Sequence, residues 1–310
     1  MRVRVLGSAA GGGYPQWNCN HPNSRRARDP NDAAAIQRTQ SSIAVSNDGE
    51  HWFLFNASPD LRKQINDNDV LHPKADLRHS PIQGVVLTNA DVDHIAGLLN
   101  LRESHPLRIY ATGKVLDVLK ANSIFSVLNP DFVERMTMTL DEPIELVGPD
   151  GTASGIHVVP FAVPGKVALW LEDKSKPVDT KAMGEDTVAL EVKDDSGKTR
   201  FFYIPGCAEM PDWLVARLNG APMVLFDGTL WRDDEMIISK VGVKTGHRMG
   251  HMSLSGEDGT IAAFEPLGVE RKIFIHINTT NPVLLEDSPE RATANAAGWQ
   301  VSYDGMEIAL

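Results

Sequence analysis

The chain has 310 residues and a formal net charge of −11, and 42% of its residues are hydrophobic and 23% charged. This composition is typical of a globular protein with enough length for a sizeable core, and the acidic balance argues against a nucleic-acid-binding surface. No apolar run approaches the roughly 20 residues of a membrane span. The start of the chain lacks the apolar core of a signal peptide, and two cysteines are too few for a disulfide framework, so we expect a cytoplasmic protein.

Short apolar runs recur along the whole chain and predict β-strands. They lie at residues 3–6, 42–45, 52–55, 85–87, 109–111, 144–147, 157–161, 188–192, 201–204, 223–226 and 272–275. Helices are predicted around residues 60–67, 94–102, 114–121, 211–218, 256–265 and 288–297. Because strands come in runs and then together with helices, in two halves, the order favours an αββα sandwich, a layered α/β fold, over a purely parallel sheet. We expect residues 1–310 to form a single domain.

Two segments lack such patterns. Residues 11–32 are rich in Gly, Asn, Pro and Arg and predict a long loop with little regular structure, and long loops inside compact domains are often functional. Residues 173–186 are polar and have no apolar period, so we expect them to run over the surface.

The sequence TNADVDH at residues 88–94 lies between two apolar runs, at a predicted transition from a strand to a helix. Adjacent Asp93 and His94 can bind one metal ion together, because we expect that the chain at this turn is not yet helical. Taken alone, a helix-capping aspartate and a packed histidine explain the pair better. A third residue, His276, changes this balance because it follows the apolar run 272–275, at the kind of strand end where active-site side chains stand.

Asp93, His94 and His276 together offer two imidazoles and one carboxylate. This set on one face of an ion leaves open coordination positions and is typical of non-haem iron(II) oxygenases. A catalytic zinc that holds a water molecule is the competing use of the same three ligands.

The spacing at residues 88–94 resembles the metal-binding motif His-x-His-x-Asp-His of the metallo-β-lactamase superfamily, with Asn89 and Asp91 in place of the first two histidines. The superfamily's further histidine and its bridging aspartate correspond to residues 159–165 and 202–208, which contain no His and no Asp, respectively. The resemblance therefore implies one metal rather than a two-metal clamp. We predict that Asn89 binds substrate and that Asp91 takes part in catalysis, with simple loop capping as the alternative for both.

A second group of polar residues lies near the end of the chain, at His247 and His251. We predict that His251 is a catalytic acid or base, because a histidine near a metal suits proton transfer at neutral pH. His247 is predicted to bind substrate, with a solvent-exposed histidine equally compatible. Asp227 ends another apolar strand and is predicted to orient His251 or a ligand histidine, although a turn aspartate before Gly228 is nearly as good an explanation.

The loop at residues 11–32 contains Cys19 and His21, which on their own are weak evidence for zinc. Arg25 and Arg26 follow. Near an active site these two guanidinium groups would suit a substrate that carries carboxylates.

Several of these segments together resemble the family of pyrroloquinoline quinone (PQQ) biosynthesis protein B, the PqqB family. The resemblance covers essentially the whole chain and is carried by residues 6–19, 56–60, 88–94, 204–210, 246–255 and 276–282. The family commonly has Cys-x-Cys-x-x-Cys as a structural zinc site in the first loop, whereas this chain has Cys19, His21 and Ser24. Serine is a poor zinc ligand, so only Cys19 and His21 remain as candidate ligands there.

The resemblance implies a role in PQQ biosynthesis, alongside other PQQ biosynthesis proteins. It implies a hydroxylase that uses iron(II) and O2 on the tyrosine ring of a cross-linked glutamate–tyrosine precursor, with Lys244 as a further contact for its carboxylates. Zinc could replace iron in a crystal. The alternatives are a carrier that brings PQQ or its precursor to the periplasm and a mononuclear zinc hydrolase. A homodimer is compatible with the sequence.

Overall fold

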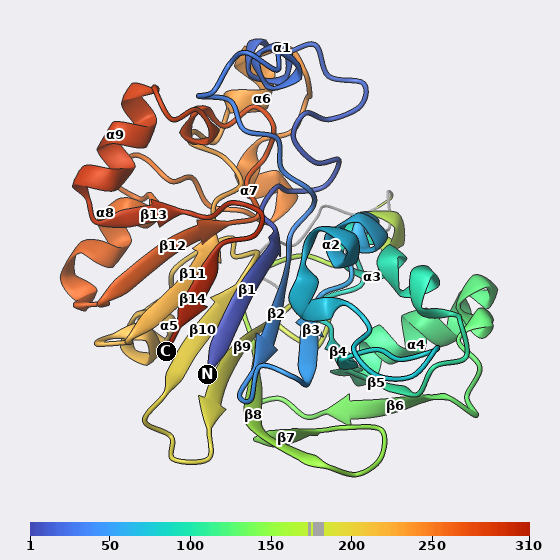
Figure 1. Cartoon of the computed structure of the whole chain (residues 1–310). Helices are drawn as coiled ribbons and strands as arrows, with labels where there is room; N and C mark the ends of the chain where they lie inside the picture. The colour runs from blue at the N-terminus through green and yellow to red at the C-terminus, as the bar shows by residue number, and fades with distance from the viewer. Residues whose placement is uncertain (173–174, 176–182) are drawn as a thin grey trace.

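Two seven-stranded β-sheets pack face to face in the computed structural model, which describes residues 1–172, 175 and 183–310 (Figure 1). Most of the polar segment 173–186 lies outside the described residues. Helices cover the outer face of each sheet, and this confirms the predicted αββα sandwich.

The first sheet has the strand order β14-β1-β2-β3-β4-β5-β6. Strands β3 to β6 are parallel to one another, whereas β14, β1 and β2 pair antiparallel. The strands are β1 Arg2–Gly7, β2 Ser42–Ser46, β3 Trp52–Phe55, β4 Ile82–Val86, β5 Leu107–Thr112, β6 Val133–Met138 and β14 Glu307–Ala309.

The second sheet has the order β13-β12-β11-β10-β9-β8-β7, with β10 to β13 parallel and the remaining pairs antiparallel. Its strands are β7 Ile144–Val147, β8 Ala153–Ala162, β9 Val188–Asp194, β10 Arg200–Ile204, β11 Met223–Asp227, β12 Arg271–Ile275 and β13 Trp299–Val301. Each sheet therefore has a parallel half and an antiparallel half.

The helices connect and cover the strands. They are α1 Pro22–Arg28, α2 Leu61–Asp67, α3 Val92–Ile95, α4 Gly113–Ala121, α5 Asp212–Leu218, α6 Glu235–Ile238, α7 Gly246–Met249, α8 Thr260–Phe264 and α9 Pro289–Ala296. Short 3-10 helices are η1 Asp69–Leu71, η2 Ala96–Leu101, η3 Ser123–Val127, η4 Leu169–Leu171, η5 Glu265–Leu267 and η6 Pro282–Leu284. None of the helices in the described part of the chain is both long and apolar enough to cross a membrane.

The core forms three layers because alternate residues of a strand point to opposite faces. In β2, Ile43 and Val45 pack between the two sheets, whereas Ala44 packs toward the helices over the first sheet. In β10, Phe201 and Phe202 divide in the same way between the sheet interface and the helices over the second sheet. The short apolar runs of the sequence are thus strands buried on both faces.

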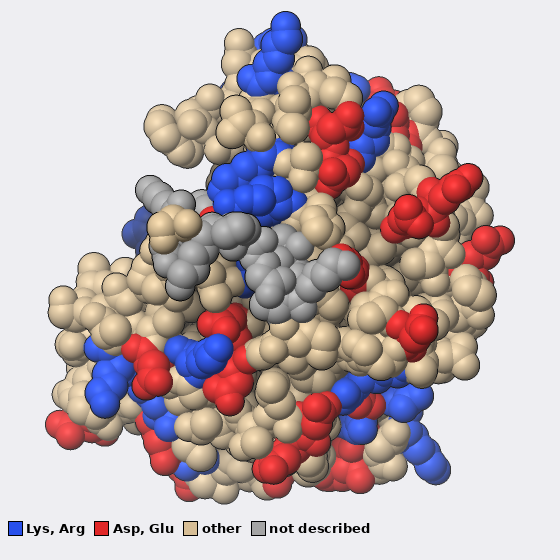
Figure 2. All heavy atoms as spheres, turned by 180° about the vertical axis from the view of Figure 1, so that it is seen from behind, with Lys and Arg blue, Asp and Glu red and all other residues tan. Residues whose placement is uncertain are grey.

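The surface carries acidic and basic side chains interspersed. On the face shown in Figure 2, one group of Lys and Arg side chains gathers in the upper part of the view, and Asp and Glu side chains lie to its right. This face has no extended basic surface of the kind that nucleic-acid binding would need.

Two local predictions were wrong. The predicted helix 94–102 is a single α-helical turn, α3, followed by the 3-10 helix η2. The reason is that Ala57 replaces hydrogen bonds within the helix. The Ala57 N–H donates to the His94 carbonyl at 2.7 Å, and the Ala57 carbonyl accepts from Gly97 N at 2.9 Å. A Cβ at Gly97 would lie 2.1 Å from the Ser58 carbonyl oxygen, so only glycine allows this approach. The loop 11–32 contains α1, which begins with Pro22 in its first turn and is capped by the His21 side chain.

Candidate metal centre

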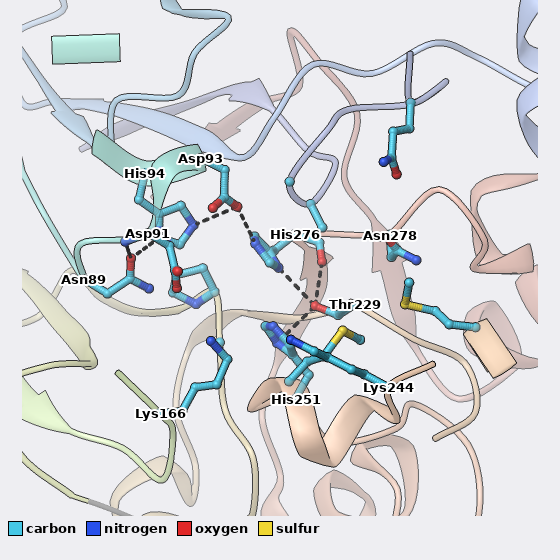
Figure 3. A pocket seen from close by; sticks show the side chains of 17 residues that line it. Asn89, Asp91, Asp93, His94, Lys166, Thr229, Lys244, His251, His276 and Asn278 are labelled. Carbon is cyan, nitrogen blue, oxygen red and sulfur yellow. Dashed lines mark hydrogen bonds and ion pairs between the residues drawn. The ribbon is translucent and has the colours of Figure 1, made fainter. Parts of the chain in front are cut away.

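A cavity of about 330 Å³ opens at the carboxyl ends of the central parallel strands (Figure 3). The segment after β4 contributes Asn89, Asp91, Asp93 and His94, and the segments after β11 and β12 contribute Thr229, His276 and Asn278. Both sheets therefore build the site, at the end of the strands where layered α/β proteins bind ligands.

Asp93, His94 and His276 converge at the centre of this cavity. One ligand atom from each can be chosen so that all three lie within 4.8 Å of one another. Asp93 Oδ2 lies 3.1 Å from His276 Nε2 and 3.8 Å from His94 Nε2. The structure thus brings the three residues together, although Asp93 and His94 lie inside helix α3, which corrects the expectation that the chain there is not yet helical.

The His94 ring is held through its far nitrogen. Its Nδ1 lies 2.8 Å from Asn89 Oδ1, and because an amide oxygen only accepts, Nδ1 carries the proton. Nε2 is buried and makes no hydrogen bond with the described residues. The ring therefore presents an unpartnered lone pair toward Asp93, as a metal ligand would.

His276 is held in the same way by Thr229. The Thr229 hydroxyl donates to Asp227 Oδ1 at 2.6 Å, the shortest of its contacts, so that its oxygen accepts from His276 Nδ1 at 3.0 Å. His276 Nε2 is then turned toward Asp93. The backbone of His276 has a φ of 60°, a left-handed conformation that costs a non-glycine residue about 1 kcal/mol. Such strain is concentrated at functional sites.

Asp227 is the buried centre of this arrangement. It accepts hydrogen bonds from Cys207 N at 3.0 Å, from Thr229 N at 3.0 Å and from His251 Nδ1 at 2.7 Å. The His251 and His276 rings are stacked, with centroids 5.2 Å apart. Asp227 thus fixes the Nδ1–H form of His251 and, through Thr229, that of His276.

Burial and charge set the protonation of the central residues. Burial opposes ionisation of Asp93, but His94 and His276 outweigh it and hold the pKa of the Asp93 carboxyl below its ordinary value. Burial lowers the pKa of His94 despite the attraction of Asp93. Burial also opposes the charged form of His276, but the hydrogen bond to Asp93 and the charges of the nearby carboxylates together outweigh it and raise the pKa of His276. A carboxylate Asp93 and a neutral His94 are the forms in which these groups bind metals.

These observations fit a metal ion held by Asp93, His94 and His276. The buried, unpartnered Nε2 of His94 is the decisive one, because a buried polar atom without a partner is costly unless something binds it. The alternative group Asp227, His251 and His276 also lies within 4.8 Å, but both Asp227 oxygens already accept hydrogen bonds. Asp227 is therefore suited to orient the histidines and not to bind the ion.

Comparison with known proteins agrees with this geometry. The sequence model of the beta-lactamase superfamily domain matches residues 51–277. Coenzyme PQQ synthesis protein B of Xanthomonas oryzae pv. oryzae is 56% identical over 310 residues, with 100% of both chains covered, and that of Gluconacetobacter diazotrophicus is 56% identical over 304 residues, with 98% of both covered. The crystal structure of Zn(2+)-bound PqqB from Methylobacterium extorquens superposes with a TM-score of 0.94 at 50% identity over 100% of both chains.

The chain belongs to the PqqB family of coenzyme PQQ synthesis proteins. Its fold is that of the metallo-β-lactamase superfamily, which is typical of metal-dependent enzymes. The similarity to a zinc-bound PqqB supports metal binding in this family.

In this PqqB-family chain, the half of the pocket around Asn89 and Asp91 lacks the imidazoles of a first metal site. Asn89 Oδ1 accepts from Asp91 N at 3.0 Å as well as from His94. Asn89 therefore caps its own loop, which is the alternative considered from the sequence, and it also orients a ligand histidine. Substrate binding by Asn89 stays a prediction.

Three predicted substrate contacts do not line this pocket. Arg26 Nε lies 2.6 Å from Asp32 Oδ2, and its Nη2 lies 2.7 Å from Asp287 Oδ2. Arg25 donates to the Asn20 carbonyl at 2.9 Å. His247 lines a neighbouring cavity of about 530 Å³. The structure brings none of the three to the residues around Asp93, because these side chains are engaged elsewhere.

The first loop also departs from the PqqB family's cysteine pattern in its contacts. His21 Nδ1 accepts from Asn23 N at 3.3 Å, and His21 N donates to Cys19 Sγ at 3.4 Å. Ser24 is buried against Thr279, with 2.8 Å between their hydroxyl oxygens. Among the described residues, no group of three metal-binding side chains includes Cys19 or His21. A structural zinc there stays a prediction.

Sequence reasoning missed two residues of the site, Thr229 and Lys166. Thr229 stands two residues after Asp227, at a strand end where a polar side chain is itself a signal. Lys166 lines the pocket opposite Asp93, and it follows the segment in which the superfamily places a metal-binding histidine. A lysine directly after a segment that lacks the expected histidine was the signal in the sequence that could have identified it.

Proposed function

We propose that the chain is an iron(II)- and O2-dependent hydroxylase of PQQ biosynthesis, acting on the tyrosine ring of a cross-linked glutamate–tyrosine precursor. The observation that carries the proposal is the convergence of Asp93, His94 and His276 into a set of two histidines and one carboxylate. Iron(II) bound by this set would supply the open coordination positions at which non-haem oxygenases activate O2.

The neighbouring residues support one metal and not two. Asn89 and Asp91 stand in place of two imidazoles, and Gly206 and Cys207 stand where the superfamily has its bridging aspartate. Gly206 lies beside His251, since a Cβ at this glycine would be 3.6 Å from His251 Cε1. The site therefore lacks the bridging carboxylate of two-metal hydrolysis.

His251 is proposed as the proton-transfer residue. Its Nδ1 proton is held by Asp227 at 2.7 Å, which leaves Nε2 to accept or return a proton in the cavity that His251 lines. Asp227 is a positioning residue because it acts through His251 and Thr229. Asp91, which also lines the cavity, is proposed to assist with protons or substrate.

Oxygen uptake tests the proposal directly. The protein is loaded with iron(II) under anaerobic conditions, and the cross-linked glutamate–tyrosine compound is then added with oxygen and a reductant such as ascorbate, which supplies the two electrons that take the second oxygen atom to water. We expect oxygen consumption and a product with one added oxygen atom, and we expect neither from the His276→Ala variant. An absence of substrate-dependent oxygen uptake by the iron-loaded protein would sink the proposal.

The same experiment separates the alternatives. A mononuclear zinc hydrolase would turn over an ester or phosphodiester without oxygen when loaded with zinc. A carrier for PQQ or its precursor would bind tightly without turnover, and its binding would survive His276→Ala.

The proposed setting is the cytoplasm, where the precursor and the other PQQ biosynthesis proteins would be partners. The names of the curated relatives support the pathway. Because segments from both sheets meet at one cavity, we also propose that residues 1–310 act as one domain.

A further inference from the structure

Two ammonium groups line the cavity together with the candidate metal ligands. They belong to Lys166 and Lys244. Figure 3 shows both side chains reaching into the pocket from the side opposite Asp93. Asp91 and Asp93 line the same cavity, so the two ammonium groups balance these carboxylates. A divalent ion at Asp93 would then leave an excess of positive charge, which favours an anionic ligand.

Lys166 is held firmly in place. Its carbonyl accepts from Thr187 Oγ1 at 2.9 Å, and its stem packs against Gly250, where a Cβ would lie 3.3 Å from Lys166 Cγ. Its Nζ donates to the Val167 carbonyl at 3.2 Å and lies 3.4 Å from Glu172 Oε1. An ammonium has three N–H donors, so these contacts within the described residues leave one for a ligand.

The charge around Lys166 is not balanced by Glu172. This half-buried carboxylate also binds Arg248, with Arg248 Nη2 3.0 Å from Glu172 Oε2. One carboxylate thus serves two cations, and the group keeps a net positive charge. Buried charge favours a counter-ion, so the cluster is prepared to receive an anion from the cavity.

Lys244 supplies the second cation. It is half-buried, and it makes no hydrogen bond or ion pair with any residue of the described ranges 1–172, 175 and 183–310. It directly precedes Thr245, whose hydroxyl caps helix α7 by accepting from Arg248 N at 3.2 Å. The cap fixes the backbone from which Lys244 extends.

We propose that Lys166 and Lys244 form a two-point carboxylate-binding subsite, which binds two carboxylates of the substrate and directs its ring toward Asp93, His94 and His276. Lys166 stands in the half of the pocket that has Asn89 and Asp91 in place of imidazoles, so an ammonium supplies the positive charge that a second metal would supply elsewhere in the superfamily. The inference rests on the proposed function for the identity of the substrate.

Binding of the cross-linked glutamate–tyrosine compound and of its carboxylate methyl esters tests the subsite. Calorimetry on the zinc-loaded protein measures Kd without turnover. We expect Lys166→Met and Lys244→Met each to weaken binding of the compound about 10- to 100-fold, the usual effect of losing a hydrogen bond to a charged group. The matched control is Lys120→Met, on the exposed end of α4, which should bind like the wild type.

The esters show whether each lysine acts on a carboxylate. On the wild-type protein, the ester of the carboxylate that a lysine contacts should bind more weakly, and the corresponding lysine variant should show little further loss with it. The subsite would be overturned if the loss of affinity from the ester and the loss from the lysine variant added in full. It would also be overturned if the diester bound the wild-type protein with an unchanged Kd. The diester titration needs no variant, so a misfolded variant does not weaken the test.

The outcome is separable from that of the proposed function. Tight binding that depends on both lysines, without any hydroxylation by the iron-loaded protein, would keep the subsite and overturn the hydroxylase. Hydroxylation by the iron-loaded protein together with binding that does not depend on the lysines would keep the hydroxylase and overturn the subsite.

Discussion

The two halves of the pocket differ in what their side chains can hold. Around Asp93, each ligand histidine donates its Nδ1–H to a fixed acceptor, which is Asn89 for His94 and Thr229 for His276. Each histidine thereby turns its Nε2 toward Asp93 Oδ2. Around Asn89 and Asp91, no imidazole of a first metal site remains, and Lys166 lines the cavity instead. The first half can bind a metal cation, whereas the second half supplies a cationic side chain. The comparison teaches that losing metal ligands can convert half of a two-metal site into a place for an anion.

The largest effect is expected from removing a ligand of the first half. His94→Ala should lose essentially all active-site metal, because it removes the buried Nε2 that has no hydrogen-bond partner among the described residues. Metal analysis after loading and desalting checks this. The control is His157→Ala, from the partly exposed group of Glu145, His157 and Asp195 outside the cavity, which should keep its full active-site metal content. Stoichiometric metal in the His94 variant would show that another residue completes the site.

A buried carboxyl without a cation beside it gives a reference for Asp93. Burial raises the pKa of Glu235 to about 7 from 4.5, although hydrogen bonds from Thr280 and Trp231 favour its ionised form. The folded protein therefore binds this proton more tightly than the unfolded chain. The stability from Glu235 is fully present below about pH 4.5 and declines by about 3 kcal/mol as the pH rises to about 7.

Urea unfolding of the wild type and of Glu235→Gln between pH 4.5 and 8 measures this contribution. The difference in unfolding free energy between the two proteins should shift in favour of the variant as the pH rises. Parallel pH profiles would mean that Glu235 titrates normally and that burial does not govern it.

The next smaller effect concerns the support of His276. Thr229→Val removes the hydroxyl that links His276 to Asp227 and should weaken metal affinity about 10- to 100-fold, as the loss of such indirect support usually does. Thr229→Ser keeps the hydroxyl and should restore most of the affinity. Competition with a chelator of known affinity compares the two. Equal weakening in both variants would assign the effect to packing of the threonine methyl group.

The smallest effect is expected from a cation outside both halves. Arg26→Ala breaks exposed ion pairs with Asp32 and Asp287, which are worth about 1 kcal/mol or less in stability. Binding of the glutamate–tyrosine compound should stay within about twofold of the wild type, since such a change is below 1 kcal/mol. Thermal unfolding and calorimetry check the two statements, and a large loss of binding would return Arg26 to the list of substrate contacts.

Much of the fold and the central triad could be predicted from local sequence. Buried strands such as β4 and β12 are short apolar runs. His276 directly follows β12, and Asp93 and His94 lie in α3, the first helix after β4. Strand β6 and the short strands β13 and β14 were not predicted. Strand β6 carries exposed and half-buried residues, and the other two span three residues each, so their apolar patterns are weak.

The rest of the site depends on contacts that no local pattern records. Thr229 matters because β11 and β12 are neighbours in one sheet, which places its hydroxyl beside His276. Arg26 is engaged by Asp287, 261 residues later in the chain. An arginine beside another arginine looks the same in the sequence whether or not a carboxylate pairs with its guanidinium group.

The position of the site across two sheets has a consequence for the chain as a polymer. Asp93 and His276 are 183 residues apart in sequence, so an ion shared by them would cross-link the protein around a long loop. Closing such a loop removes conformational freedom mainly from the unfolded chain, and the affinity for the ion is then part of the folding free energy. The ion can be held by all three side chains only when both sheets are in place, so metal content would measure how fully the two sheets have assembled.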